Sequence, residues 1–179
     1  MPPSAHVLRA HFDPVAAPAA RTEDPLEAAA RRLLAELPLR SRVLEVGCGT
    51  GQLARALAAR RGARVTAIDL VPRNIDVARV RTGASLGIDY RVADFMALSP
   101  RGFDAIVAVD TLHELPLAAA AAQMGSGVVP GGLVLIADVH GRELGSLRAI
   151  RTTLRGVLPG VQVRRRLGGR YTAFWRRPR

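Results

Sequence analysis

The stretch Val43-Leu44-Glu45-Val46-Gly47-Cys48-Gly49-Thr50-Gly51 decides the fold of this chain. Its first four residues, three of them apolar, are typical of a buried strand, and three glycines at alternate positions follow. Glycine lets the backbone adopt conformations that other residues avoid, and it lets a ligand lie close against the chain. A helical pattern over residues 52–61 comes next, and its first N–H groups have no partner within the helix. The stretch therefore predicts a strand, a tight turn and a helix start that together form a cofactor-binding loop.

Strands and helices alternate on both sides of this loop. We expect helices over residues 25–37, 52–61, 72–82, 116–124 and 143–156, and strands over residues 43–46, 64–68, 88–92, 103–109 and 133–137. Most of these strands are continuous apolar runs, which is the pattern of a parallel sheet covered on both faces. The fold class is therefore α/β, with a Rossmann-like, doubly wound, mostly parallel sheet.

The C-terminal part departs from this alternation. Residues 161–163 and 171–175 have the composition of strands, and Gly168-Gly169 lies between them. Because no crossover helix fits in so short a connection, we expect the two strands to form an antiparallel hairpin that completes a seven-stranded sheet.

Length and composition limit the organisation of the chain. Its 179 residues favour one domain over residues 23–179, after a Pro- and Ala-rich segment, residues 1–22, that we expect to form a tail or a partial lid. Cys48 is the only cysteine, which excludes an internal disulfide, and we expect a cytoplasmic protein. Residues 115–137 are uncharged, but prolines and glycines interrupt them, so we expect no membrane span.

The charge distribution is strongly basic towards the C-terminus. The formal net charge is +11, and ten arginines follow Glu143, the last acidic residue. A basic C-terminal surface of this kind is able to meet an anionic partner such as a nucleic acid.

Two cofactors fit the glycine loop. Residues 49–54, Gly-Thr-Gly-Gln-Leu-Ala, match the G-x-G-x-x-G/A pattern of dinucleotide-binding loops, and Asp69 lies 20 residues after Gly49. A nicotinamide cofactor is therefore one alternative. The other is S-adenosylmethionine, because the carboxylate of Glu45 would repel a pyrophosphate but would tolerate a sulfonium or an ammonium group. Asp69, Asp94 and Asp110 close neighbouring strands at the same edge of the predicted sheet and add to this negative charge.

Residues 40–140 are similar to class I S-adenosylmethionine-dependent methyltransferases, of the small-molecule type related to the quinone-methylating enzymes. The resemblance is carried by the segments 43–51, Asp69, 93–95, 103–113 and 130–133. It implies that the chain binds S-adenosyl-L-methionine, with S-adenosyl-L-homocysteine as product, and transfers its methyl group. Residues 12–16 faintly resemble the N-terminal lid of these enzymes.

The resemblance implies a set of cofactor contacts. Asp69 would accept the ribose hydroxyls, Asp94 would accept from the adenine amino group, and Glu45 or Asp110 would balance the charge of the methionine part. The complete set of expected cofactor-binding residues is Glu45, Gly47, Cys48, Gly49, Gly51, Asp69, Leu70, Ala93, Asp94, Phe95 and Asp110. Cys48 would be a small filler in the turn and not a nucleophile.

Two histidines are candidate catalytic bases. His113 follows the strand over residues 103–109, and His140 follows the strand over residues 133–137, so both lie at the edge that holds the cofactor loop. Histidine titrates near neutral pH and suits removal of a proton from a hydroxyl acceptor. Glu114 and Asp138 are near them in sequence, but the spacing matches no metal-ligand pattern, and we expect no metal.

The methyl acceptor is expected to be a small molecule. Asp110-Thr111-Leu112-His113 stands where enzymes that methylate base amino groups carry an Asn/Asp-Pro-Pro-aromatic segment, and aromatic residues are only 4% of the chain. Methylation of RNA or another nucleic acid, and a non-catalytic cofactor-binding subunit, are the alternatives. Because the connections after residue 139 and around residues 168–169 are short, the acceptor site is expected to be open or to be completed by a homodimer.

Overall fold

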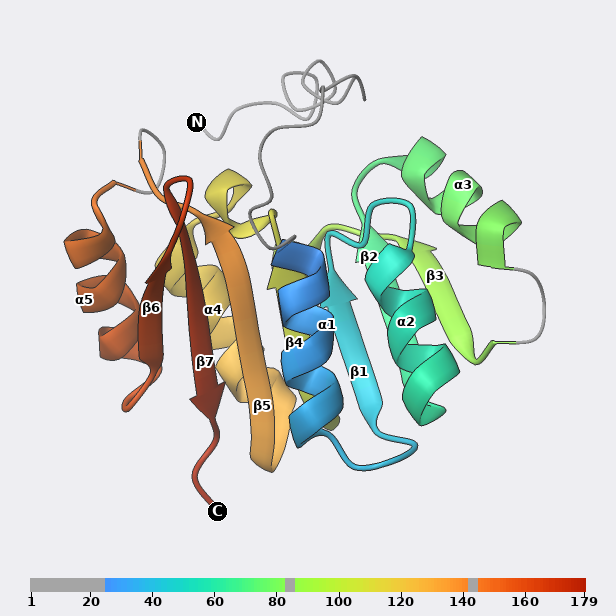
Figure 1. Ribbon diagram of the computed structural model, residues 1–179, viewed down its shortest axis with the longest axis horizontal. Helices are drawn as coiled ribbons and strands as arrows, with labels where there is room; N and C mark the ends of the chain where they lie inside the picture. The colour runs from blue at the N-terminus through green and yellow to red at the C-terminus, as the bar shows by residue number, and fades with distance from the viewer. Residues whose placement is uncertain (1–24, 83–85, 142–144) are drawn as a thin grey trace.

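The computed structural model describes residues 25–82, 86–141 and 145–179 (Figure 1). The strands are β1 (Arg42–Val46), β2 (Arg64–Asp69), β3 (Ile88–Val92), β4 (Phe103–Val109), β5 (Val128–Val139), β6 (Gln162–Arg166) and β7 (Arg170–Arg176). The helices are α1 (Pro25–Glu36), α2 (Gln52–Arg61), α3 (Pro72–Thr82), α4 (Leu117–Gly127) and α5 (Leu147–Val157), with the 3-10 turns η2 (Phe95–Ala97) and η3 (Leu112–Glu114). The expected tail or lid over residues 1–22 lies outside the described residues.

The strands form one seven-stranded sheet in the order β3-β2-β1-β4-β5-β7-β6. The neighbours from β3 to β5 pair in parallel, whereas β7 pairs antiparallel with both β5 and β6. This confirms the predicted α/β class and the C-terminal hairpin. Strand β1 lies between β2 and β4, so the chain winds away from β1 in both directions, and the carboxyl end of β1 is where such sheets bind ligands.

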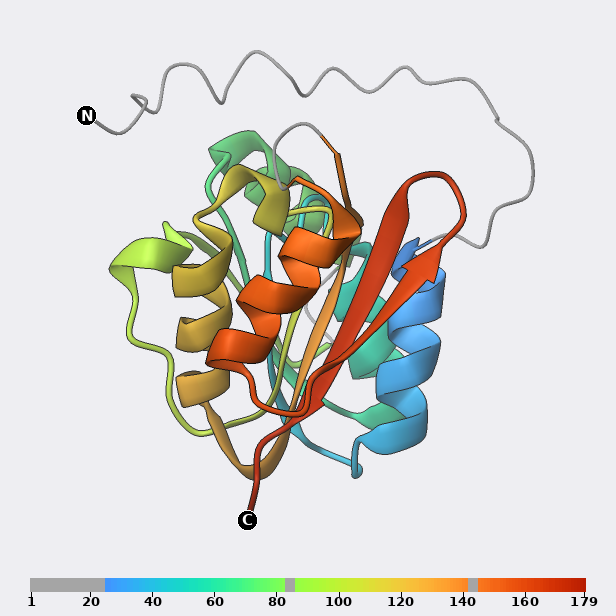
Figure 2. The ribbon, with the colours of Figure 1, turned by 90° about the vertical axis from the view of Figure 1, so that its left-hand side faces the viewer.

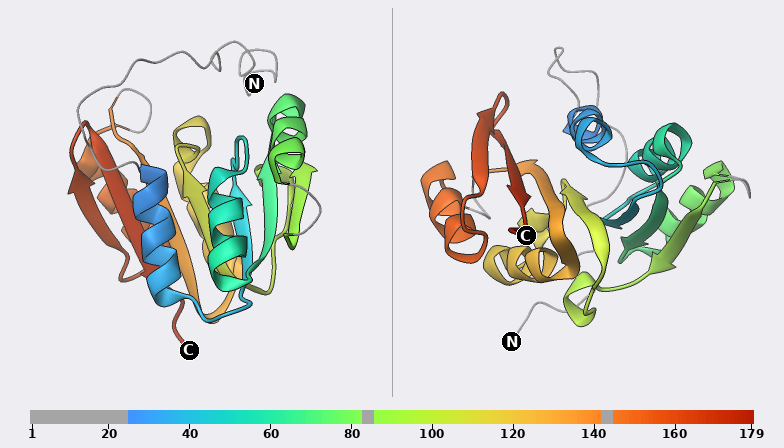
Figure 3. Two further views of the ribbon diagram at one scale, coloured as in Figure 1. Left: turned by 45° about the vertical axis from the view of Figure 1, so that its right-hand side comes forward. Right: turned by 90° about the horizontal axis from the view of Figure 1, so that it is seen from below.

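Helices cover both faces of the sheet, as the views in Figure 2 and Figure 3 show. Helices α1, α2 and α3 bury residues such as Leu33, Leu57 and Ile75 in one apolar cluster. Helices α4 and α5 bury Met124 and Leu154 in a second cluster on the opposite face. The continuous apolar strands predicted from sequence are therefore explained by burial on two sides.

Several element ends differ from the sequence prediction. Helix α5 begins at Leu147 and not at residue 143, because the Ser146 side chain accepts a hydrogen bond from the Ala149 N–H at 3.2 Å and caps the helix. Strand β5 begins at Val128, ahead of the expected residue 133. Val128 pairs with Phe103 across a register shift, and Gly131, at φ 80°, allows the strand to continue through that irregularity.

In the part of the chain that the structure describes, no helix is both long enough and apolar enough to cross a membrane.

Candidate cofactor and active site

The glycine turn joins the carboxyl end of β1 to the start of α2. Its three glycines, Gly47, Gly49 and Gly51, have φ values of 70°, 50° and 78°, a region that side-chain-bearing residues rarely adopt. The backbone N–H groups of Gly47 and Cys48 both donate to the Ile68 carbonyl, at 2.8 and 2.9 Å. The end of β2 therefore fixes the path of the turn.

Each of the three glycines faces different surroundings. A Cβ atom on Gly47 would lie 2.1 Å from Thr111 Oγ1, and one on Gly51 would lie 2.3 Å from the Tyr90 hydroxyl oxygen. The protein's own packing therefore requires these two glycines. A Cβ atom on Gly49 would meet nothing within 4 Å, so the turn presents bare backbone to open space at this position. That is the surface a closely bound ligand needs.

Asp69, at the end of β2, stabilises the glycine turn by hydrogen bonds. One oxygen of its carboxylate accepts from the Gly49 N–H at 2.8 Å, and the other accepts from the Val71 N–H at 2.9 Å and the Asn74 amide at 3.2 Å. The side chain is 8% exposed. The hydrogen bonds from the turn to Asp69 were not predicted from sequence. The expected contact between Asp69 and a ribose stays a prediction.

Glu45 is a buried carboxylate directly behind the turn. It is 2% exposed, accepts a backbone hydrogen bond from Ala54 in α2, and its Oε2 atom has no hydrogen-bond partner among the described residues. Burial, assisted by the nearby charge of Asp69, raises the pKa of Glu45 to about 8. The acid is therefore mostly protonated at neutral pH, and a cationic group beside its unpaired oxygen would favour the ionised carboxylate, whereas a pyrophosphate would oppose that ionisation. The site therefore fits S-adenosylmethionine better than a dinucleotide.

The titration of Glu45 predicts how the stability of the chain depends on pH. Its folded-state pKa of about 8 lies above the ordinary value of 4.5, so folding favours the protonated acid. We expect a stabilising contribution on the order of 5 kcal/mol that is complete below pH 4.5 and is lost as the pH rises to about 8. Urea unfolding across this pH range measures the free energy of unfolding, and Glu45→Gln should remove its decrease with rising pH. An equal decrease in the two proteins would contradict the raised pKa of Glu45.

The residues expected around the adenine follow β2 and β3. The Asp94 side chain is exposed, and its Oδ1 accepts from the Met96 N–H at 2.8 Å, which caps η2. Phe95 is buried, the Ala93 N–H donates to the Asp69 carbonyl at 3.0 Å, and Leu70 is exposed. The structure thus brings these residues to the edge that holds the glycine turn, and their contacts with a cofactor stay predictions.

Asp110, which follows β4, has a different partner from the one expected. It adopts a φ of 49°, and its carboxylate forms an ion pair and hydrogen bond with Arg170, the first residue of β7. Arg170 balances the charge of Asp110 in this structure, and the contact expected between Asp110 and the cofactor stays a prediction. The ion pair depends on the closing hairpin, and no local sequence pattern associates Arg170 with Asp110.

Asp138, at the end of β5, organises the loop after β4. Its Oδ2 accepts from the backbone N–H groups of Thr111, Leu112 and His113, at 3.1, 2.6 and 3.2 Å. Its Oδ1 accepts from the Val139 N–H at 2.7 Å and lies 2.8 Å from His113 Nδ1. The Asp138 side chain is fully buried, so this carboxylate fixes both the backbone and the ring of His113. Sequence reasoning considered Asp138 only as a metal ligand, although its place at a strand end was the signal.

The two candidate bases have different surroundings. His113 Nδ1 lies 2.8 Å from Asp138 Oδ1, a geometry that suits an N–H donor to the carboxylate, and Nε2 lies 3.4 Å from Glu114 Oε1. The side chain of His113 is 18% exposed. His140 donates its backbone N–H to the Gly169 carbonyl at 2.8 Å, and its Nε2 is buried without a hydrogen-bond partner in the described ranges. Among the described residues, a carboxylate orients the ring of His113 and none orients that of His140.

Cys48 lies in the turn as a buried, uncharged side chain. Burial, with the nearby carboxylates of Glu45 and Asp69, raises the pKa of its thiol above the ordinary range, and its Sγ donates weakly to the Gly49 carbonyl at 3.6 Å. A thiol held in this protonated form agrees with the role of a filler.

Comparison with known proteins identifies the family to which this sequence belongs. The family model described as a methyltransferase domain matches residues 43–132, half of the chain. A ubiquinone biosynthesis O-methyltransferase from Methylocella silvestris is 48% identical over 103 residues, covering 55% of this chain and 40% of the relative. One of the same name from Xylella fastidiosa is 42% identical over 105 residues, covering 56% of this chain and 42% of the relative. The chain spans less than half the length of these curated relatives.

Solved structures share the fold at low sequence identity. The N-methyltransferase NodS from Bradyrhizobium japonicum, in complex with S-adenosyl-L-homocysteine, superposes with a TM-score of 0.68 at 23% identity, covering 88% of this chain and 90% of its own. A methyltransferase in complex with the Haloferax volcanii Trm112 activator superposes with a TM-score of 0.72 at 17% identity. The match covers 88% of this chain and 91% of that chain.

The matched segment contains the glycine turn, Glu45, Asp69 and His113, which are among the expected site residues. A nicotinamide cofactor is therefore excluded as the alternative that the glycine pattern left open. The chain belongs to the methyltransferase domain family, within the class I S-adenosylmethionine-dependent methyltransferases.

Proposed function

We propose that this chain transfers the methyl group of S-adenosylmethionine to a hydroxyl group of a small aromatic molecule. The observation that carries the proposal is the pairing of His113 with the buried Asp138 at the carboxyl edge of the sheet, 2.8 Å apart. A hydroxyl must lose its proton to become a good nucleophile, and an oriented imidazole is suited to accept it. The relatives named as ubiquinone biosynthesis O-methyltransferases support an oxygen acceptor.

The residues of this chain would divide the work between binding and proton transfer. When bound, the cofactor supplies an activated methyl group on a sulfonium. The bare backbone at Gly49 and the unpaired Oε2 of Glu45 would hold its methionine part. Asp138 would hold the His113 ring through Nδ1, and Nε2, which lies 3.4 Å from Glu114 Oε1, would remove the acceptor's proton. Orientation and exclusion of water would supply the remaining acceleration.

Replacement of His113 tests the proposed base. We expect His113→Gln to lower kcat by about 100-fold or more with a catechol as acceptor, because general-base catalysis contributes about 10²- to 10⁴-fold. The affinity for S-adenosylhomocysteine should stay within about twofold, because His113 follows β4 and not the glycine turn. Steady-state kinetics and calorimetry with S-adenosylhomocysteine measure the two quantities.

His140→Gln is the matched control for this experiment. Because no carboxylate orients the His140 ring in the described structure, we expect kcat to change by less than about threefold. Equal losses in the two variants, or an unchanged rate in His113→Gln, would remove His113 from the mechanism. Cofactor binding without turnover on any phenol, amine or carboxylate would indicate a non-catalytic subunit instead.

We further propose that the acceptor site is completed outside the described residues. The connection from β6 to β7 spans only residues 167–169, so the hairpin carries no inserted lid. Cover for the acceptor would come from the segment over residues 1–22 or from a second copy of the chain. Light scattering with and without S-adenosylhomocysteine tests the dimer. A chain that stays monomeric during turnover would exclude it, and methylation of RNA in place of phenols would overturn the small-molecule assignment.

A further inference from the structure

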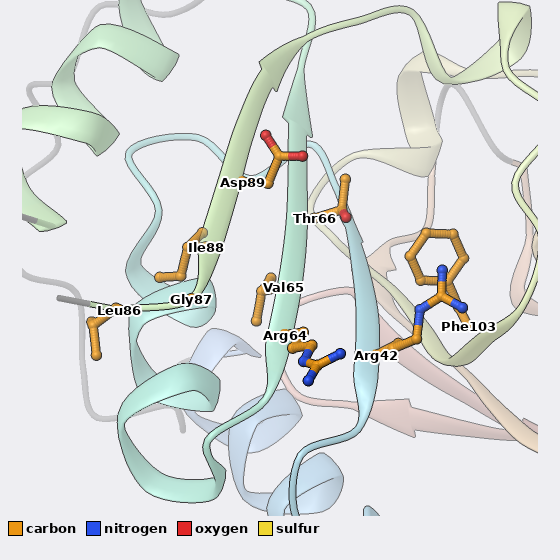
Figure 4. Close-up of a pocket in the computed structure, with 9 residues that line it drawn as sticks. All are labelled: Arg42, Arg64, Val65, Thr66, Leu86, Gly87, Ile88, Asp89 and Phe103. Carbon is orange, nitrogen blue, oxygen red and sulfur yellow. The ribbon is translucent and has the colours of Figure 1, made fainter. Parts of the chain in front are cut away.

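The amino ends of four parallel strands line an open cavity, shown in Figure 4. Its volume is about 440 Å³, within the usual range for small-molecule sites. Arg42, Arg64, Ile88 and Phe103, the first residues of β1, β2, β3 and β4, all line it. The glycine turn follows the carboxyl end of β1, so the cavity lies at the opposite edge of the sheet and is separate from the cofactor site.

The charged part of the cavity lies on a sheet face that the helices leave open, whereas Val65, Leu86 and Ile88 line the cavity from the side covered by α1, α2 and α3. Arg42 and Arg64 alternate with Val43 and Val65, which face α1, α2 and α3, so the arginines project from the other face. On that face α4 packs against β4 and β5. The neighbouring part of the face, over β1, β2 and β3, is where the cavity is found (Figure 4).

Two exposed arginines on adjacent strands line this cavity, and among the described residues Asp104 accepts only from the backbone N–H of Arg42, at 2.7 Å. Arg42 and Arg64 are register partners on adjacent parallel strands, a position where like charges destabilise a sheet. Within residues 25–82, 86–141 and 145–179, neither guanidinium forms a hydrogen bond or an ion pair. An oxyanion placed between them would remove this repulsion and accept hydrogen bonds from both.

The single carboxylate that lines the cavity does not fill this role. Asp89 lies opposite Thr66, not opposite either arginine, and its Oδ2 accepts from Arg91 Nε at 2.7 Å. Arg91 therefore neutralises Asp89, and the cavity keeps the positive charge of Arg42 and Arg64.

Arg42 is held in place before any ligand arrives. Its guanidinium carbon lies 5.5 Å from the centre of the Phe103 ring, within the range of a cation–π interaction. It also lies over Gly102, where a Cβ atom would be only 3.2 Å from Arg42 Nη1. A guanidinium fixed in this way loses little conformational entropy on binding an anion.

We propose that this cavity binds a small organic anion, with a phosphate or carboxylate group held between Arg42 and Arg64. The apolar body of the ligand would lie against Phe103, which lines the same cavity and packs on the same side of the sheet. The site is independent of methyl transfer and would be present whether or not the chain is catalytic.

Titration with phenyl phosphate, inorganic phosphate and benzoate tests this site by two-dimensional NMR of the arginine Nε–H groups. In the presence of S-adenosylhomocysteine, phenyl phosphate should bind saturably at one site and shift the Arg42 and Arg64 signals. Arg42→Gln and Arg64→Gln should each weaken this binding about tenfold or more, since each removes charge-assisted hydrogen bonds. Arg155→Gln, an exposed residue of α5, makes the same charge change elsewhere and should leave the affinity unchanged.

Comparison of the three probes separates the possible sources of binding. Tighter binding of phenyl phosphate than of inorganic phosphate supports the apolar contacts, and the comparison with benzoate identifies the preferred acidic group. No saturable binding of any probe would overturn the proposal. Equal weakening in Arg155→Gln would also overturn it, because the effect would then come from net charge alone.

Discussion

Replacement of Asp138 by Ala is expected to lower the free energy of unfolding by about 3–5 kcal/mol. The carboxylate is fully buried and accepts hydrogen bonds from four backbone N–H groups and from the His113 ring. Its removal would leave these donors unpaired away from water, and each unpaired buried donor costs about 1–3 kcal/mol, part of which local rearrangement recovers. Urea denaturation followed by circular dichroism measures the change.

Asp76→Ala provides the matched control for Asp138. The Asp76 side chain is 73% exposed, and its contact with Arg79 one turn along α3 is 3.9 Å long, so the expected change is below about 0.5 kcal/mol. Asp138→Asn should fall between the two variants, because an amide oxygen still accepts some of the hydrogen bonds. A change below about 1 kcal/mol for Asp138→Ala would show that the loop after β4 is held by other contacts.

The second large effect is expected at Gly49. Gly49→Ala should weaken the binding of S-adenosylhomocysteine by about 100-fold, because the added methyl group would stand in the open space where we propose that the cofactor lies against the backbone. The protein should stay folded, since the new Cβ atom meets nothing within 4 Å. Only the left-handed backbone, at φ 50°, would cost stability, by about 1–2 kcal/mol. Calorimetric titration and thermal unfolding measure the two effects separately.

Two further glycine variants separate backbone strain from ligand contact. Gly160→Ala places a methyl group at φ 82°, also with nothing within 4 Å, but in the turn after α5, and should cost similar stability without changing cofactor affinity. Gly47→Ala should unfold the turn itself, because its Cβ would lie 2.1 Å from Thr111 Oγ1. Normal affinity in a folded Gly49→Ala protein would remove the glycine turn from the cofactor site.

The sequence predicted the architecture well because the signals were local and periodic. Apolar runs, helix patterns and the short connection at Gly168-Gly169 were sufficient for the seven-stranded sheet and its antiparallel hairpin. Element ends were less accurate where a single side chain or a bulge decided them. The Ser146 cap and the irregular start of β5 at Val128 are two examples.

The sequence predicted which site residues lie at the ends of strands, but not the partners of those residues. Carboxylates at the ends of β1, β2 and β4 were identified, but their partners come from segments distant in sequence. Arg170, 60 residues away, pairs with Asp110, and Thr111, 64 residues after Gly47, fills the space that requires that glycine. The sequence pattern of one element does not predict contacts with a distant element. The hydrogen bonds of Asp69 to the glycine turn and of Asp138 to His113 were therefore found only in the structure.

Calorimetric titration with S-adenosylhomocysteine and, separately, with NAD⁺ tests most directly the claim that the glycine turn and Glu45 form an S-adenosylmethionine site. We predict saturable binding of S-adenosylhomocysteine with one molecule per chain, weakened about 100-fold by Gly49→Ala and unchanged by Gly160→Ala, and no saturable binding of NAD⁺. Saturable binding of NAD⁺ by the folded protein, with none of S-adenosylhomocysteine, would contradict it.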